Sequence, residues 1–296
     1  MNTDLNFAPR LNTITYWEFS FTQKNLIGLV LSYSETFVSY NMPFRIIPIL
    51  LISNGEVVKT QKFKRPRYIG DPLNIIKIFN EKEIDELIVL DIDTSKKKSA
   101  INFKLIEDIA SECFFPLTYG GGVKNLSDVN TLIKFGIEKV SIQTSIFERP
   151  EFISDVVQQF GSQSVVASID IKKNFLGKQG VYSHSKNKII GYSIEKTIAD
   201  LEQVGIGELL INDVDRDGTM SGYDLNLVKQ CAQVATVPVI MSGGLSGIGE
   251  MRKLYDLGIS AAAGGAYFIF QGAKRGILVT YPEEDKITKK LGDRFE

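Results

Sequence analysis

Two stretches of this sequence, Leu90-Asp91-Ile92-Asp93 and Ile211-Asn212-Asp213-Val214-Asp215, resemble each other, since each carries an apolar run into acidic residues. They lie about 120 residues apart, and a fixed interval of this kind indicates an internal structural repeat. Gly120-Gly121-Gly122 recurs as Gly243-Gly244 at the same interval. The chain from Arg45 onward is therefore predicted to consist of two similar halves.

Short β-branched runs alternate with longer amphipathic segments throughout this region, a rhythm that predicts parallel strands joined by helices. Strands are expected at residues 45–52, 86–91, 115–119, 139–143, 164–170, 208–213, 237–242 and 260–264. Eight strands could form an open doubly wound sheet, but two matching four-strand halves favour a closed (β/α)8 barrel, which has no exposed edges. The closing helix, expected within 271–282, should be short or irregular because that stretch contains Gly272 and Gly276.

Length and composition fit one such barrel, with 296 residues, 44% apolar residues and a formal net charge of −1. No charge bias points to nucleic acid or to a membrane surface as a partner. No apolar run reaches the length needed to span a bilayer, and no leader pattern opens the sequence. A cytoplasmic protein is expected.

Residues 1–41 do not share the strand and helix rhythm. They are interpreted as an N-terminal extension, disordered or upstream of a true start near Met42, or alternatively as a small cap on the barrel. The phosphate-binding barrel is then expected to occupy residues 42–296.

His184 is the single histidine, so a histidine-based metal cluster is excluded, and neither a metal nor a cofactor is expected. It lies in the polar stretch Ser183-His184-Ser185-Lys186-Asn187, which is interpreted as a loop tip on the surface. The basic stretch 62–67 is interpreted as a solvated loop unless a phosphate lies nearby.

Glycine-rich turns follow several predicted strands, at the end of the barrel where function is located in such folds. Glycine lets the backbone approach a ligand closely, and exposed backbone N–H groups attract anions. Two opposed phosphate sites are predicted, and a ligand with two phosphate groups is therefore expected. The residues assigned to them are Gly122, Gln143 and Thr144 in one half, and Asp217, Gly218, Gly243, Gly244, Gly265 and Ala266 in the other.

Two charged residues near the same end are candidates for chemistry. Asp170 ends the fifth strand, where a carboxylate can act as a general acid or base, or instead cap a helix or pair with Lys172. Lys59 follows the first strand and could hold an anionic substrate or be solvated.

Together these residues resemble a known family. The matching motifs, in chain order, are Arg45-Ile-Ile-Pro48, Asn54-Gly-Glu-Val-Val-Lys59, Gly70-Asp71-Pro72, Asp85-Glu86-Leu87, Tyr119-Gly-Gly-Gly-Val123, Lys139-Val-Ser-Ile-Gln-Thr144, Phe160-Gly161-Ser162-Gln163, Asp213-Val-Asp-Arg-Asp-Gly-Thr219, Ser221-Gly-Tyr-Asp224 and Ser242-Gly-Gly244. The sequence from about Arg45 to Phe270 resembles the cyclase (HisF-type) subunit of imidazole glycerol phosphate synthase.

The resemblance implies a HisH-type glutaminase partner on the N-terminal face of the barrel and ammonia passing through the barrel to a phosphate-binding mouth. It also implies a gate of charged residues, which falls on Arg45, Glu86, Lys139 and Glu208 in this sequence. Without the resemblance, these four would be taken as ordinary salt bridges at strand starts, although two opposite-charge pairs fit a buried ring better.

The mouth departs from the family at the end of the first strand, where the resemblance implies an aspartate opposite Asp170 and this chain has Leu51. A leucine cannot transfer a proton, so impaired cyclase chemistry is expected. Gln143 and Ala266 also replace the family's asparagine and serine.

Two interpretations follow. In the first and preferred one, the chain is a paralogue that works with a glutaminase and a sugar amidotransferase, supplying ammonia to amidinate an acetamido sugar of a surface polysaccharide. In the second it is an active cyclase of histidine biosynthesis, which closes a ring on a formimino-aminoimidazole ribonucleotide. A non-catalytic scaffold that binds a phosphometabolite is a third alternative, which the intact gate argues against.

Overall fold

The computed structural model describes residues 43–94, 99–191 and 193–292. The N-terminal extension predicted for residues 1–41 lies outside these ranges, and the boundary at residue 42 stays a prediction.

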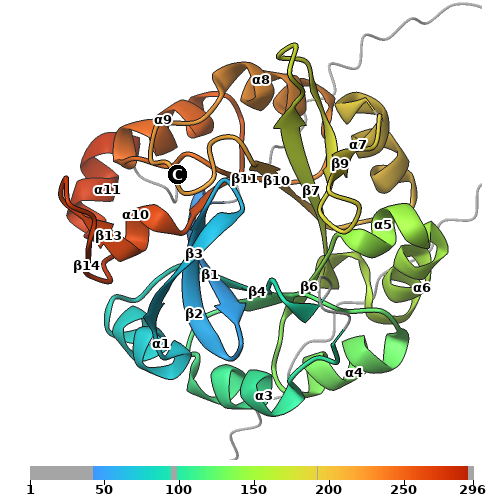
Figure 1. Ribbon diagram of the computed structural model, residues 1–296, viewed down its shortest axis with the longest axis horizontal. Coiled ribbons are helices and arrows are strands. Elements are labelled where there is room, and N and C mark those ends of the chain that lie inside the picture. The colour runs from blue at the N-terminus through green and yellow to red at the C-terminus, as the bar shows by residue number, and fades with distance from the viewer. Residues whose placement is uncertain (1–42, 95–98, 192, 293–296) are drawn as a thin grey trace, which may run out of the picture. The chain divides into compact units, whose positions relative to one another are not determined.

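Eight parallel strands form a closed ring (Figure 1). In ring order they are β1 Arg45–Ser53, β4 Leu87–Asp91, β5 Leu117–Gly120, β6 Lys139–Ile142, β7 Val165–Lys173, β10 Glu208–Asp213, β11 Val239–Ser242 and β12 Ala261–Gly264. The ring closes because β12 pairs with β1, while β7 pairs with β10 at the junction of the two halves. The predicted (β/α)8 barrel is confirmed, with its strands within two residues of their expected starts.

Helices surround the barrel on the outside (Figure 1). They are α1 Pro72–Glu81, α3 Phe103–Glu112, α4 Leu126–Lys134, α5 Thr144–Glu148, α6 Pro150–Phe160, α7 Ile194–Gln203, α8 Leu225–Val234, α9 Ile248–Asp256, α10 Ala266–Ile269 and α11 Glu284–Leu291, with a 3-10 turn at Ser162–Ser164. Local sequence sets their starts: the Asp71 side chain accepts from the Asn74 N–H at 2.9 Å, and Pro72 occupies the first turn.

The closing helix was placed wrongly. Residues 271–282 contain a small hairpin of β13 Phe270–Gln271 and β14 Gly276–Ile277, and the helix α11 comes only after it. Gly272 adopts a left-handed φ of 69°, which suits a tight turn and not a helix.

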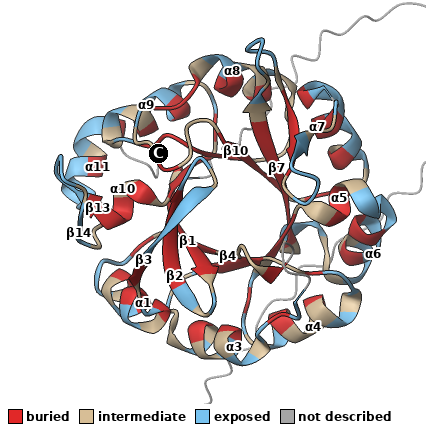
Figure 2. Ribbon diagram, in the orientation of Figure 1, coloured by how far each residue is buried: buried red, intermediate tan, exposed pale blue. Residues whose placement is uncertain are grey.

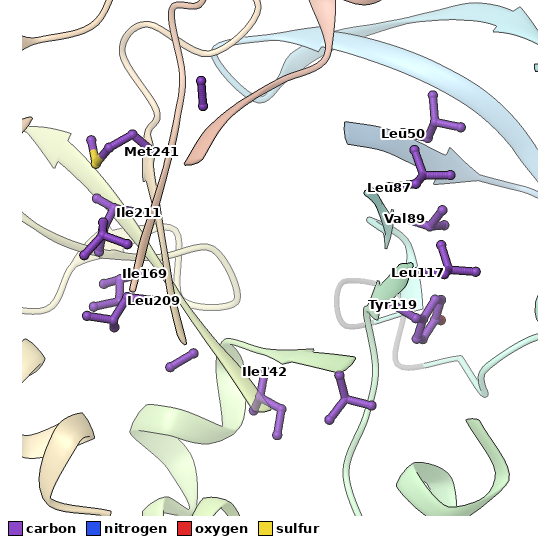
Figure 3. Close-up of a cluster of buried hydrophobic side chains, with 14 of the residues drawn as sticks. Leu50, Leu87, Val89, Leu117, Tyr119, Ile142, Ile169, Leu209, Ile211 and Met241 are labelled. Atoms are coloured by element: carbon purple, nitrogen blue, oxygen red, sulfur yellow. The ribbon is translucent and has the colours of Figure 1, made fainter. Parts of the chain in front are cut away.

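Two apolar layers result from the alternation of side chains along each strand. Leu50 and Ile52 point outward and pack beneath the helices, whereas Ile49 and Leu51 belong to a separate cluster inside the barrel. Figure 2 shows the buried strands within a partly exposed ring of helices, and Figure 3 shows the outer layer around the strands. The inner layer therefore decides what the barrel interior can accommodate.

Two hairpins extend from the carboxyl ends of the strands, which we call the mouth. One consists of β2 Glu56–Gln61 and β3 Lys64–Gly70, the other of β8 Gln179–Ser183 and β9 Lys188–Ile189. The first hairpin is fastened across the opening, because the Lys62 N–H donates to the Asp217 carbonyl oxygen at 2.9 Å. Among the described residues, no helix has the length and apolar character to cross a membrane.

Candidate functional site

A pocket of about 250 Å³ opens at the mouth, lined by the ends of β1, β4, β5, β6, β7 and β10 and by the β2–β3 hairpin. Asp170, Leu51 and Lys59 all line it. Since β1 and β7 lie on opposite sides of the ring, Leu51 and Asp170 face the pocket from opposite walls. The two positions singled out from the sequence therefore belong to one site.

Asp170 is buried at the bottom of one wall and receives two amide N–H groups. The Asn212 Nδ2 donates to its Oδ1 at 3.0 Å, and the Gln143 Nε2 donates to its Oδ2. Burial raises the pKa of Asp170 to about 7, although both amide donors act in the opposite direction. No ion pair joins it to Lys172, whose Nζ instead lies 4.5 Å from the centre of the Tyr182 ring. A carboxyl group that titrates near neutrality can both give and accept a proton.

This pKa leads to a stability prediction. Between about pH 4 and pH 7 the folded chain keeps a proton on Asp170 that the unfolded chain has released. The stabilisation from this group is therefore complete below pH 4 and is lost as the pH rises through 7. The variant Asp170→Asn should show a flatter decline in the free energy of unfolding between pH 5 and pH 8, measured with urea. Parallel curves for wild type and variant would show that Asp170 titrates at its ordinary pKa.

The opposite wall is apolar around Leu51, which is 8% exposed and packs with Ile49, Val58 and Leu90 in the inner cluster. Asp91 and Asp93 also line the pocket on this side. Their carboxylates accept hydrogen bonds from the protein: Asp91 from the N–H groups of residues 93 and 94, and Asp93 from the Ser53 hydroxyl and the Asn54 N–H. At position 51 itself, the wall can contact a ligand but cannot exchange a proton with it.

Lys59 lies in strand β2 and is only 4% exposed, so the alternative of a solvated lysine is wrong. Burial lowers its pKa, partly offset by the carboxylate of Asp217. Burial likewise raises the pKa of Asp217, against the effect of Lys59 and the Thr60 hydroxyl, which donates to it at 3.2 Å. Lys59 is therefore a buried lysine in the pocket lining, and its role in holding an anionic substrate stays a prediction.

The residues assigned to phosphate binding divide into two groups. Gly122, Gln143, Thr144, Asp217 and Gly265 line the pocket. The others follow strands β10, β11 and β12 but are not among the lining residues: Gly218, Gly243, Gly244 and Ala266. Their role in phosphate binding stays a prediction.

Two of the glycines outside the pocket lining have a clear structural reason. A Cβ atom on Gly218 would lie 2.2 Å from the Thr60 carbonyl oxygen, and one on Gly244 would lie 2.2 Å from the Gly222 carbonyl oxygen. Both residues also have positive φ angles, of 67° and 111°. These glycines let the mouth loops touch backbone to backbone, which shapes the pocket whether or not they contact a phosphate.

Some site residues were missed from the sequence. Asn212 was noted only as part of the repeat, although it holds Asp170. His184 does lie at the expected turn after β8, but the surface position was wrong: it is half-buried and lines the pocket, 5.4 Å from the ring centre of Phe63. The hairpin pattern of 181–190 was the available signal, because an insertion after a barrel strand lies at the mouth.

At the opposite end of the barrel, four charged side chains form a closed ring. Arg45 bonds to Glu86 at 2.6 Å and also contacts Glu208, while Lys139 lies 3.3 Å from Glu86 and 3.1 Å from Glu208. The Thr118 hydroxyl donates to Glu86 at 3.0 Å. Burial alone would lower the pKa of Arg45, but the two carboxylates outweigh it and hold the pKa above its ordinary value. The four residues predicted to form a ring are thus in contact.

Fold and site together define a class: a (β/α)8 barrel with a ligand pocket at the carboxyl ends of its strands and a charged ring at their amino ends. The histidine biosynthesis protein family matches residues 45–274, and the chain belongs to this family. Among the described residues, no group of three or more histidine, cysteine or acidic side chains could hold a metal ion.

Individual relatives show which members of this family the chain resembles. A protein of Leptospira interrogans, provisionally named imidazole glycerol phosphate synthase subunit HisF, is 44% identical over 245 residues, which are 82% of this chain and 96% of the relative. A second provisionally named subunit, hisF2 of Pseudomonas aeruginosa, is 43% identical over 82% of this chain and 97% of its own length. The HisF subunit of Alkaliphilus metalliredigens is 36% identical over 74% of this chain and 87% of its own length. The chain is a HisF-like barrel of the imidazole glycerol phosphate synthase family.

Proposed function

We propose that this barrel receives ammonia from a glutaminase bound to its N-terminal face and delivers it to the mouth for amidination of an acetamido sugar. The observation that carries the proposal is a contrast between the two ends of the barrel. The charged ring of Arg45, Glu86, Lys139 and Glu208 is complete, whereas Leu51 occupies the position opposite Asp170 at the mouth.

The space between the two ends supports passage of a neutral molecule. The inner cluster consists of apolar side chains from six of the eight barrel strands and from β2: Ile47, Ile49, Leu51, Val58, Ile88, Val166, Leu210, Ile240, Ala261 and Ala263. Ammonia can cross such a region, but an ammonium ion would lose its hydration there, and the buried hydroxyl groups of Ser141 and Ser168 would replace it only in part. An apolar interior above a ring of charges thus favours ammonia over ammonium.

An exposed aromatic residue supports partner binding at the N-terminal face. Phe114 precedes strand β5, at the ring end of the barrel, and is 84% exposed. Large exposed aromatic side chains often become buried anchors of protein interfaces. We assign this face to the glutaminase, and the other end to a sugar amidotransferase that uses the ammonia.

Labelled nitrogen tests this function. The chain is combined with the glutaminase and the sugar amidotransferase of the same organism, the acetamido sugar, and ATP, from which the amidotransferase activates the acetamido oxygen so that it can leave. Glutamine labelled with ¹⁵N in its amide group and excess unlabelled ammonium are the two nitrogen sources. With the barrel present, the amidino product should keep most of the label, and without it the label should be diluted. Equal dilution in both reactions would disprove delivery through the barrel. The variant Ser127→Ala, at an exposed position of helix α4 that belongs neither to the pocket lining nor to the charged ring, serves as a control.

Ring closure in histidine biosynthesis is the second candidate function. The pKa of Asp170, about 7, favours it, because one carboxyl group could then serve both as acid and as base. It requires that water replace the carboxylate missing at position 51, and substitution of Leu51 separates the two functions.

A further inference from the structure

The two walls of the mouth pocket differ sharply in chemistry. On the side of β1 and β4 the lining includes the apolar residues Ile49, Leu51, Leu90 and Ile92. The carboxylates of Asp91 and Asp93 lie on the same side and accept hydrogen bonds from the protein itself. On the side of β6, β7 and β10 the lining includes two primary amides and a carboxyl group. A ligand group held between these walls needs one apolar face and one face that forms hydrogen bonds.

The polar wall is preorganised and still has hydrogen-bonding capacity. Asn212 and Gln143 each use one amide N–H to hold Asp170. Within the described residues no protein group donates to either amide carbonyl oxygen. Each amide therefore offers a ligand one acceptor oxygen and a second N–H. Such a wall complements another amide, which has one donor and one acceptor in a plane.

The apolar surface of Leu51 and Leu90 disfavours a positive charge. An ammonium group placed against it would be desolvated, and the Asp91 and Asp93 carboxylates of this side already accept hydrogen bonds from the protein. A methyl group would instead gain from contact with Leu51 and Leu90. The ligand group that fits this wall is therefore uncharged and carries both a methyl group and an amide. An acetamido group has these properties.

The rest of the ligand must be anionic. Lys59 is buried in the lining, and Gly122, Thr144 and Asp217 surround the same pocket. A buried lysine is costly unless an anion meets it, and Asp217 offsets only part of that cost. A phosphate group carried on the same molecule as the acetamido group satisfies this part of the pocket.

We propose that the mouth pocket binds a phosphorylated acetamido sugar, with its methyl group against Leu51 and its amide against Asn212, Gln143 and Asp170. This inference rests on the proposed function and names the substrate class of that site. It places the acetamido carbon within the barrel mouth, where ammonia would arrive, and makes Leu51 a specificity-determining residue.

Calorimetry on the full chain tests the inference with three probes: N-acetylglucosamine 1-phosphate, glucosamine 1-phosphate and glucose 1-phosphate. These share the ring and the phosphate and differ only in the group at one carbon. The acetamido probe should bind about tenfold more tightly than either of the others, as expected for one amide contact and one buried methyl group. Equal binding of all three, tighter binding of glucosamine 1-phosphate, or no binding of any would overturn the inference.

Variants at Leu51 and Asn212 test whether each wall contributes to the preference for the acetamido probe. Leu51→Asp should reduce the preference for the acetamido probe over the ammonium probe at least tenfold, because the new carboxylate pairs with the ammonium group. Leu51→Asn, uncharged and of similar volume to aspartate, should reduce it less. Asn212→Leu should weaken the acetamido probe and leave glucose 1-phosphate unchanged. Unaltered ratios in correctly folded variants, checked by circular dichroism, would overturn the inference.

The labelled-nitrogen experiment separates this result from the proposed function. If the label is retained while the probes show no acetamido preference, the barrel delivers ammonia to a sugar held elsewhere, and only the present inference fails.

Discussion

Replacing Leu51 by aspartate should raise ammonia-dependent ring closure by this chain by about 10²–10⁴-fold, the usual contribution of a general acid or base. The new carboxylate would stand on β1, across the pocket from Asp170 on β7. The two groups could then take opposite roles, one giving a proton while the other accepts one. Turnover of the formimino-aminoimidazole ribonucleotide, with ammonium salt as the nitrogen source, measures the effect.

The substitution has a cost in stability, which has to be measured separately. Leu51 is 8% exposed within the inner cluster, so an aspartate there loses apolar contacts and is partly desolvated. The variant Leu51→Asn carries a similar cost without a titratable group and is the matched control. It should remain as slow as the wild type.

Wild-type turnover within tenfold of the Leu51→Asp rate would contradict the prediction. It would mean that Asp170 and water suffice for ring closure, and that the chain is an active cyclase despite its leucine. If the wild type and a correctly folded Leu51→Asp variant both turn over slowly, position 51 is not what limits ring closure. The limiting substitution would then be sought at Gln143 or Ala266.

The barrel could be predicted from the sequence because its two signals are local and repeated. Each strand is a short apolar run, and the two halves recur at one interval, so the strand limits differ from the structure by only a few residues. The charged ring was predicted from the family resemblance, and the fold explains why its members meet: they stand at the starts of strands, or one residue before in the case of Glu86. The parallel strands of a barrel place such positions at one end.

The mouth was harder to predict because segments inserted between strands and helices fold back over it. From the sequence, Lys59 could either hold an anionic substrate or be solvated, and only the β2–β3 hairpin, which buries it in the pocket, rules out the second alternative. His184 reads as a loop tip until its hairpin brings it against Phe63. Asn212 lies 42 residues from Asp170, and only the pairing of β7 with β10 sets them side by side. The contacts of Lys59 and His184 depend on the conformation of inserted hairpins, which no periodicity encodes, whereas that of Asn212 depends on the register between two strands.

The largest stability loss should come from the ring. Glu86→Ala is expected to lower the free energy of unfolding by about 3–5 kcal/mol, the usual result of removing one partner from a buried charge network. Glu86 is 2% exposed and contacts Arg45, Lys139 and Thr118. Without it, Glu208 alone faces two largely buried cations. Urea unfolding, followed by circular dichroism at neutral pH, measures the loss.

Matched variants separate charge from packing. Glu86→Gln keeps the volume and the acceptor oxygen for Thr118 but removes the charge, so it should lose nearly as much stability as Glu86→Ala if unpaired cations are the cause. An exposed ion pair gives the contrast: Asp200→Ala, which breaks the pair with Lys196 on helix α7, should cost less than about 1 kcal/mol.

The double variant Glu86→Gln with Lys139→Met decides between a structural ring and a gate. It removes one charge of each sign and leaves the pair of Arg45 and Glu208 intact, so much of the lost stability should return. A ring that only stabilises the barrel would then work normally. If the ring is a gate, the loss of two of its four charges should let unlabelled ammonium enter the barrel. Unlabelled nitrogen would then dilute the label in the product of the labelled-glutamine reaction. Recovered stability with undiluted label would show that the ring holds the barrel together and does not select what passes through it.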